Sequence, residues 1–131
     1  MSISSLYNHL RQIAVDEFAD IVVEAEIEAL STGDPRKLRL SIVDGSFVDI
    51  FVSLTNRYSY HWQRTSEHSN ALYRHDNAPH SSWRSISTYP KHFHKGDEQN
   101  VVASHLSSDP PVALREFCKF VRETLRHESQ R

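Results

Sequence analysis

The sequence predicts an α+β fold: an antiparallel meander of about five strands, with an N-terminal helix and a C-terminal helix packed on the sheet. At both ends of the chain, apolar residues recur every three or four positions, as on one face of a helix. Between them, apolar and polar residues alternate in five short runs separated by turn residues, as in half-buried strands. Residues 76–108 fit neither pattern, and we predict a long histidine-rich loop between the last strand and the C-terminal helix.

Length and composition are those of one globular domain. The chain has 131 residues, 38% of them hydrophobic and 24% charged, so we predict a single domain, residues 1–131, whose core spans about residues 3–127. No apolar run reaches the roughly 18 residues of a membrane span, and no secretory segment follows Met1. The single Cys118 excludes an internal disulfide framework, and we expect a cytoplasmic protein.

The charge is divided unevenly along the chain. Residues 1–34 carry a net charge of −6 and the remainder carries +4. An acidic surface beside a basic one would repel phosphate on one side and attract it on the other. We prefer the simpler interpretation, in which the acidic part is a solvated strand face rich in glutamate.

The elements follow in order along the chain. The N-terminal helix is predicted from an apolar stripe of Ile3, Leu6, Leu10 and Ile13. After Asp20, three glutamates alternate with an apolar face made of Val23, Ala25, Ile27 and Ala29. The next three strands have inward faces of Leu38, Leu40 and Ile42, of Val48, Ile50, Val52 and Leu54, and of Tyr58, Tyr60 and Trp62. Asp44-Gly45 is a strong hairpin signal, and the run NALYRHD supplies the fifth strand.

The C-terminal helix has a clear beginning. Asp109 precedes Pro110 and Pro111, which predicts an N-cap followed by the residue type favoured in the first helical turn. The apolar stripe that follows consists of Leu114, Phe117, Cys118, Val121 and Leu125. Cys118 is therefore expected to pack as a small hydrophobe.

A cluster of histidines is the main functional signal. Seven of the nine histidines lie between residues 61 and 105. Imidazole titrates near neutrality, so it can both give and take a proton during one turnover. We assign the base and acid of metal-free RNA phosphodiester cleavage to His80, His92 and His94. Cations for the phosphate are available at Arg74, Arg84, Lys91 and Lys95.

Aromatic residues accompany these histidines. Unpaired bases can stack on the rings of Tyr58, Tyr60, Trp83, Tyr89 and Phe93. Tyr58 and Tyr60 also have a structural interpretation, because they share one face of their strand with Trp62. Histidines in a polar loop likewise have a structural interpretation, as exposed or hydrogen-bonded side chains.

A metal site is the alternative to acid/base chemistry. His92 and His94 lie on the same side if their segment is extended, and His75, Asp76 or His80 would complete three ligands. The sequence contains neither HExxH nor CxxC. We therefore predict no metal and no cofactor, and keep a histidine-coordinated, metal-dependent nuclease as an alternative.

Two further residues have competing roles. His61 lies on the polar face of its strand, where it would join a site built across the sheet or bond to a neighbouring strand. Asp76 begins the turn Asp76–Pro79, so its side chain would cap backbone N–H groups or orient a histidine. If the loop forms a site, His80, His92 and His94 should converge near His61 and Asp76.

Three motifs, YSYHWQ (58–63), YRHDNAPH (73–80) and YPKHFHKGD (89–97), occur in this order. Together they resemble the TumE-like toxin family of prokaryotic type II toxin-antitoxin systems, over most of residues 36–100. Carried over residue by residue, the family pattern points to His61, Asp76, Asn77, His80, His92 and His94. At Ser81 and Lys91 the family tends to have further histidines, so this chain departs from the pattern there.

The resemblance implies a toxin that slows growth and is paired with a helix-turn-helix antitoxin protein. We predict an endoribonuclease with catalytic His80, His92, His94, His61 and Asp76, and with substrate contacts at Arg74, Lys95, Tyr58, Tyr60 and Asn77. RNA is the expected substrate, and no membrane partner is expected. Two alternatives are a toxin that blocks a translation component by binding, and an accessory fold whose histidine loop completes a homodimer interface.

Overall fold

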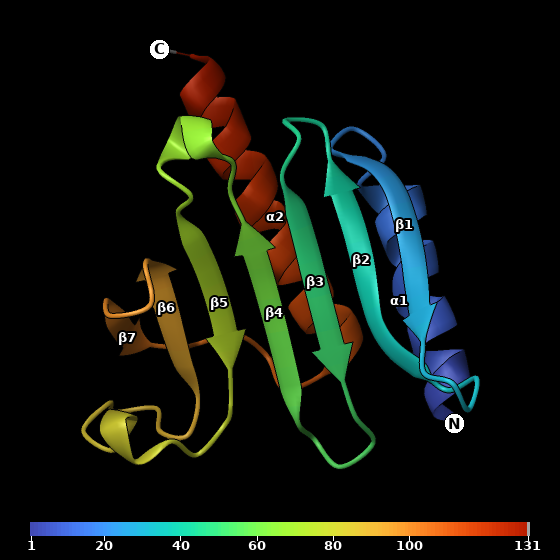
Figure 1. The fold of residues 1–131 in the computed structure, drawn as a ribbon, viewed down its shortest axis with the longest axis horizontal. Helices are drawn as coiled ribbons and strands as arrows, with labels where there is room; N and C mark the ends of the chain where they lie inside the picture. Colours follow the sequence, from blue (N-terminus) through green and yellow to red (C-terminus); the bar gives the residue numbers. More distant parts are fainter. Residues whose placement is uncertain (131) are drawn as a thin grey trace.

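The computed structural model describes residues 1–130, which form one antiparallel sheet and two helices (Figure 1). The helices are α1 (Ile3–Glu17) and α2 (Pro110–Ser129). The strands are β1 (Val22–Ala29), β2 (Pro35–Ile42), β3 (Phe47–Val52), β4 (Tyr58–Gln63), β5 (Leu72–Asp76), β6 (His92–Gly96) and β7 (Val101–Ala103). Two short 3-10 helices, η1 (Ser66–His68) and η2 (Ser81–Trp83), interrupt the connections on either side of β5.

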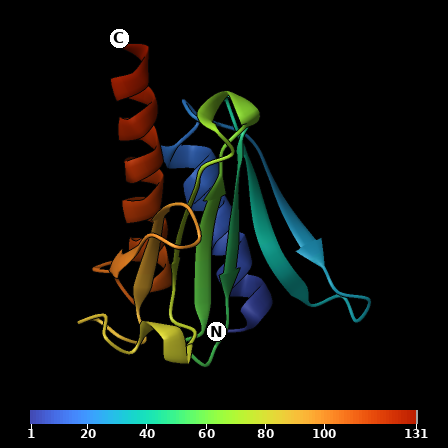
Figure 2. The same ribbon diagram turned by 60° about the vertical axis from the view of Figure 1, so that its left-hand side comes forward.

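The seven strands are ordered β1 to β7 across the sheet, so each strand pairs with its neighbour in sequence. Both helices lie on the same side of this sheet, with α1 behind β1 and β2 and α2 behind the middle strands (Figures 1 and 2). We call the covered side the helix face and the other side the open face. The α+β class and both helices are as the sequence predicts.

The number of strands and the position of the loop differ from the prediction. The sequence predicts about five strands followed by one long loop, whereas β6 and β7 both form within that segment. The histidine-rich loop is therefore shorter, comprises residues 77–91 and lies between β5 and β6. Phe93 is the only large apolar residue of β6, and β7 has three residues. Neither strand is long enough or aliphatic enough to show the alternation that identifies a strand in a sequence.

Three apolar residues, Val23, Ala29 and Leu54, lie outside the positions that the alternation assigns to them. Ala29 is exposed, after a register shift between Glu28 and Ala29 at the end of β1. Val23 is 69% exposed, because the pairing of β1 with β2 shifts register between Val22 and Glu24 and leaves Val23 out of the inward row. Leu54 is 60% exposed, because β3 ends at Val52 and the chain has already entered a turn. The inward row of β1 is instead begun by Val22 and Ala25, which are buried.

The core lies between the helices and the inward rows of β1 to β4. The buried stripe of α2 includes Leu114, Phe117 and Val121, and Asp109 caps the helix by accepting a hydrogen bond from the Val112 N–H. Burial raises the pKa of the Cys118 thiol to about 12, which keeps it protonated. Among residues 1–130, neither helix combines the length and apolar character needed to cross a membrane.

Candidate functional site

Polar residues of β4, β5 and β6 gather on the open face. Arg74 of β5 is paired with His61 of β4 and with His94 of β6. Asp76, two residues further along β5, is paired with His92. Cross-strand partners point to the same side of a sheet. Antiparallel pairing therefore brings these five side chains into one area of the surface.

The loop between β5 and β6 covers this area and makes it a pocket. Its Trp83 ring lies 6.1 Å from the His92 ring and 5.7 Å from the His94 ring, measured between centroids. The two histidines are only 2% and 3% exposed. The resulting histidine pocket has a volume of about 280 Å³ and is lined by Arg74, Asp76, Ala78, His80, Trp83, His92, His94 and Glu98.

His92 is held between two oxygen atoms that can only accept hydrogen bonds. Its Nδ1 lies 2.9 Å from the carbonyl oxygen of Pro90, and its Nε2 lies 3.1 Å from Oδ1 of Asp76. A neutral imidazole has one N–H, so it can satisfy only one of the two oxygens. Both contacts become hydrogen bonds when the ring carries two protons. Pro90 and Asp76 therefore hold the His92 ring in place, with an acceptor oxygen facing each of its nitrogens.

The ring of His94 has a different arrangement, with its Nδ1 donating a hydrogen bond to the backbone. Its Nδ1 lies 2.9 Å from the carbonyl oxygen of Glu98 and donates its proton there, so Nε2 carries the lone pair. Burial lowers the pKa of His94 below its ordinary value, and the charge of Arg74 adds to this effect. The His92 and His94 rings lie 5.0 Å apart. Two imidazoles with different hydrogen-bond surroundings thus lie side by side.

Asp76 contacts a backbone N–H, a histidine and an arginine. Its Oδ1 caps the following turn by accepting a hydrogen bond from the Ala78 N–H at 3.0 Å, and the same oxygen faces His92. Its Oδ2 accepts a hydrogen bond from Nε of Arg74 at 3.2 Å. Asp76 therefore fixes the orientation of both His92 and the Arg74 guanidinium.

Glu98, which the sequence analysis did not single out, completes the charged network. Its two carboxylate oxygens accept hydrogen bonds from Nη1 and Nη2 of Arg74 at 2.7 and 2.9 Å. This contact lowers the pKa of Glu98 and raises that of Arg74. Glu98 lies in the turn between β6 and β7, where an acidic residue is ordinarily solvated, so nothing in the sequence marks it.

The other two histidines predicted to be catalytic, His80 and His61, lie further from the pair formed by His92 and His94. His80 lines the pocket but is exposed, and its Nδ1 accepts a hydrogen bond from the Ser82 N–H at the start of η2. His61 is linked to the pocket through Arg74, whose Nη1 lies 3.4 Å from Nδ1 of His61. The structure thus brings Asp76, His92 and His94 together. His80 lies at the rim of the pocket, and His61 contacts Arg74 without lining the pocket.

Several predicted substrate contacts lie away from the pocket. Tyr58 and Tyr60 are 7% and 1% exposed on the helix face, so their rings belong to the core, as their shared face with Trp62 indicates. Lys95 is paired with Tyr73 of β5, which places its side chain on the helix face, opposite the histidines. Asn77 has a structural contact, because its side-chain oxygen accepts a hydrogen bond from the Tyr58 N–H.

His75 lies on the helix face and is a core residue. Its ring stacks on Phe93 at 4.0 Å, and its Nδ1 lies 2.7 Å from Oγ of Ser104. Burial lowers the pKa of His75 to about 4. The ring is consequently neutral in the folded protein at neutral pH.

This burial predicts a loss of folding stability in acid. The pKa is about 4 in the folded protein and about 6.5 in the unfolded chain. As the pH falls below about 6.5, the unfolded chain takes up this proton first. Between pH 7 and pH 4 the free energy of unfolding should therefore fall by about 2 to 3 kcal/mol on account of His75 alone. Urea denaturation across this range should show that His75→Phe lacks this component, and an equal slope in both proteins would contradict the assignment.

Three residues of the pocket also have side chains of the kinds that bind metal ions. Among residues 1–130, Asp76, His92 and His94 offer ligand atoms that all lie within 4.8 Å of one another. Backbone carbonyls hold Nδ1 of both histidines, which is a common arrangement around metal-binding histidines. The guanidinium of Arg74, bonded to Asp76, is a fixed positive charge that opposes a second cation at this carboxylate. The donor set thus fits a divalent ion, while the charge beside it does not favour one.

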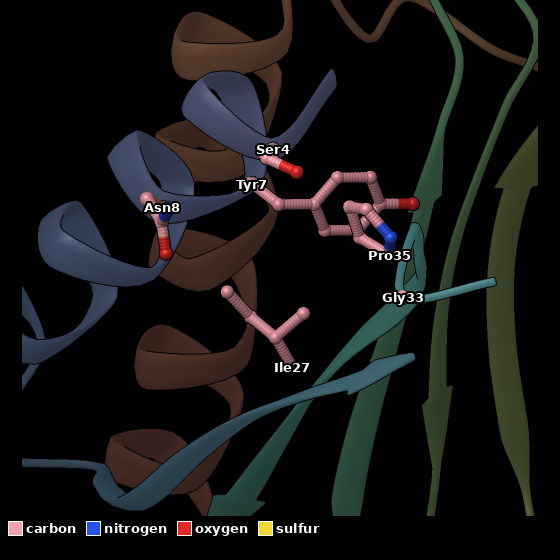
Figure 3. Close-up of a pocket in the computed structure, with 6 residues that line it drawn as sticks. All are labelled: Ser4, Tyr7, Asn8, Ile27, Gly33 and Pro35. Carbon is pink, nitrogen blue, oxygen red and sulfur yellow. The ribbon is translucent and has the colours of Figure 1, made fainter. Parts of the chain in front are cut away.

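A second cavity, of about 250 Å³, lies between α1 and the connection from β1 to β2 (Figure 3). Tyr7 is the only titratable residue of its lining. The Tyr7 hydroxyl is engaged with Val52 of β3, donating to the carbonyl oxygen at 3.2 Å and accepting from the N–H at 3.0 Å. Burial raises the pKa of Tyr7. This cavity therefore offers no group for acid/base chemistry, in contrast to the histidine pocket.

The fold and the site define an α+β protein with a buried Asp-His-His cluster on the open face of a meander sheet. Comparison with protein families identifies it further: the family model described as Toxin TumE matches residues 11–125. The chain belongs to the TumE toxin family. A toxin of this kind has a cognate antitoxin as its partner. Comparisons with curated proteins and with solved structures gave no match.

Proposed function

We propose that this toxin arrests growth by cleaving RNA in the histidine pocket, by acid/base catalysis that needs no metal ion. The observation that carries the proposal is a pair of adjacent imidazoles whose hydrogen-bond surroundings differ. His92 faces two hydrogen-bond acceptors, whereas His94 donates through Nδ1 and keeps a lone pair on Nε2. The two rings are in edge-to-face contact, with centroids 5.0 Å apart, so both can face a single phosphodiester group bound beside them in the pocket.

The proposed reaction uses one proton acceptor and one proton donor. Nε2 of His94 takes the proton of an RNA 2′-hydroxyl, whose oxygen attacks the adjacent phosphorus. Protonated His92 gives its Nε2 proton, which leaves Oδ1 of Asp76, to the departing 5′-oxygen, so the products are a 2′,3′-cyclic phosphate and a 5′-hydroxyl. Arg74 stabilises the charge that develops on the phosphoryl oxygens. Water returns both histidines to their starting states when it hydrolyses the cyclic phosphate or exchanges protons with the pocket.

We also propose which class of protein the antitoxin belongs to. The family implies an antitoxin, and we propose that it is a separately encoded helix-turn-helix protein, as the resemblance of the sequence motifs implies. An adjacent small reading frame of that class would support this. Copurification of the two proteins after joint expression is the direct measurement.

Incubation of the purified toxin with total RNA, with and without EDTA, tests the proposed function. Because no step uses a metal, cleavage should proceed at the same rate in both samples, and the products should carry cyclic phosphate ends. Cleavage that EDTA abolishes and a divalent ion restores would replace the proposal by a metal-dependent nuclease. An intact RNA pool, with growth arrest retained in cells, would favour a toxin that blocks a translation component by binding.

A further inference from the structure

The guanidinium of Arg74 is positioned at the histidine pocket but is already occupied. Its Nη1 and Nη2 atoms both donate to the carboxylate of Glu98, at 2.7 and 2.9 Å, in a two-pronged contact. A phosphate group is bound by arginine in the same two-pronged way, because its oxygens have a similar spacing and charge. Glu98 therefore occupies the position in which Arg74 would hold a phosphate.

The two carboxylates that contact Arg74 differ in how firmly they are held. The side chain of Asp76 is 13% exposed and is fixed further by the Ala78 N–H and by His92. The side chain of Glu98 is 46% exposed and lies at the pocket lining. Glu98 can therefore turn into the solvent while Asp76 keeps the guanidinium oriented.

Departure of the Glu98 side chain would leave the base in place. Nδ1 of His94 lies 2.9 Å from the backbone carbonyl oxygen of Glu98 and 3.9 Å from its carboxylate, so the hydrogen bond is to the backbone. Rotation of the side chain thus frees two N–H donors of Arg74 without disturbing the Nδ1 contact of His94.

We propose that Glu98 is an internal substitute for the substrate phosphate, which closes the Arg74 subsite until an RNA phosphate displaces it. The inference rests on the proposed function. It adds a phosphate subsite at Arg74, for which the carboxylate of Glu98 competes with the substrate phosphate. In the resting protein, Glu98 neutralises Arg74 and weakens adventitious binding of small anions. A polyanionic strand competes more effectively, because its other phosphates add to its attraction for the site.

Binding of a single-stranded RNA with 2′-O-methyl groups tests this inference, since such RNA lacks the attacking hydroxyl and cannot be cleaved by the proposed route. Glu98→Gln removes the competing charge but keeps the side-chain shape, so it should bind this RNA about 5- to 10-fold more tightly than the unaltered protein. Arg74→Gln should bind it about 10-fold more weakly. In Arg74→Gln/Glu98→Gln the gain from Glu98→Gln should be absent, because that gain acts through Arg74.

Matched controls separate this effect from a general change of charge. Glu123 is exposed on α2, behind the sheet, and Glu123→Gln changes the net charge by the same amount. Binding that tightens equally in Glu123→Gln, a gain that persists without Arg74, or weaker binding by Glu98→Gln would each overturn the inference. Absence of RNA binding by all of these proteins would overturn it as well. Because binding is measured without cleavage, failure of the catalytic proposal is recognised separately in the EDTA experiment.

Discussion

Replacement of His94 by alanine should lower the rate of RNA cleavage about 10²- to 10⁴-fold, the range typical of a lost general base. The reason is local, because His94 is the imidazole whose Nε2 keeps its lone pair inside the pocket. Growth arrest should disappear with the cleavage. The measurements are the cleavage rate of the purified protein and colony formation after induced expression.

Two further variants make this experiment decisive. His94→Gln retains a hydrogen-bond donor for the Glu98 carbonyl but does not take up a proton at neutral pH, so it should fold normally and be as inactive as His94→Ala. His105 is exposed and does not line the pocket, so His105→Ala should keep full activity. Growth arrest by a folded His94→Gln protein would show that His94 is not the base.

Replacement of Asp76 by asparagine should lower the cleavage rate about 10²-fold, because the charge that stabilises a protonated catalytic ring is lost. The amide still occupies the space of the carboxylate and can still accept from the Ala78 N–H, so the turn should remain. Measurement of the cleavage rate of the purified protein checks this expectation.

Asp34, exposed in the connection between β1 and β2, supplies the control. Asp34→Asn makes the same chemical change far from the pocket and should leave the rate unaltered. If Asp76→Asn matched the unaltered protein in its cleavage rate, the pairing of Asp76 with His92 would have no part in the reaction.

The sequence was informative wherever apolar spacing was regular. The stripes of the two helices and the inward rows of β2 to β4 follow directly from residue spacing, because burial of one face imposes a period on the sequence. Asp76 and His92 were singled out by residue type, but their pairing depends on β6, which the sequence did not reveal. Once residues 92–96 are known to be a strand, strict alternation also explains why Lys95 points away from His94.

Other features depend on tertiary structure alone. Glu98 contacts Arg74 only because a four-residue turn returns β7 alongside β6. Trp83 covers the histidines only because the loop bends over the open face instead of away from it. Neither contact follows from a periodic pattern or a motif. The sequence could therefore suggest the histidines, Asp76 and Arg74 from their side-chain chemistry, but not that Trp83 covers them or that Glu98 pairs with Arg74.

Pairing of β5 with β6 has a consequence for how such a site can diversify. His92, His94 and Arg74 are all carried by these two strands, and their side of the sheet is determined by whether their positions are odd or even in the register. A shift of β6 by one residue would exchange both histidines with Phe93 and Lys95 and move the histidines to the helix face in a single step. Residues 77–91 are outside this constraint. Under the proposed function, the reaction chemistry therefore depends on which face of the sheet these strand residues occupy. Target choice depends instead on the length and composition of residues 77–91, so the two properties can change independently.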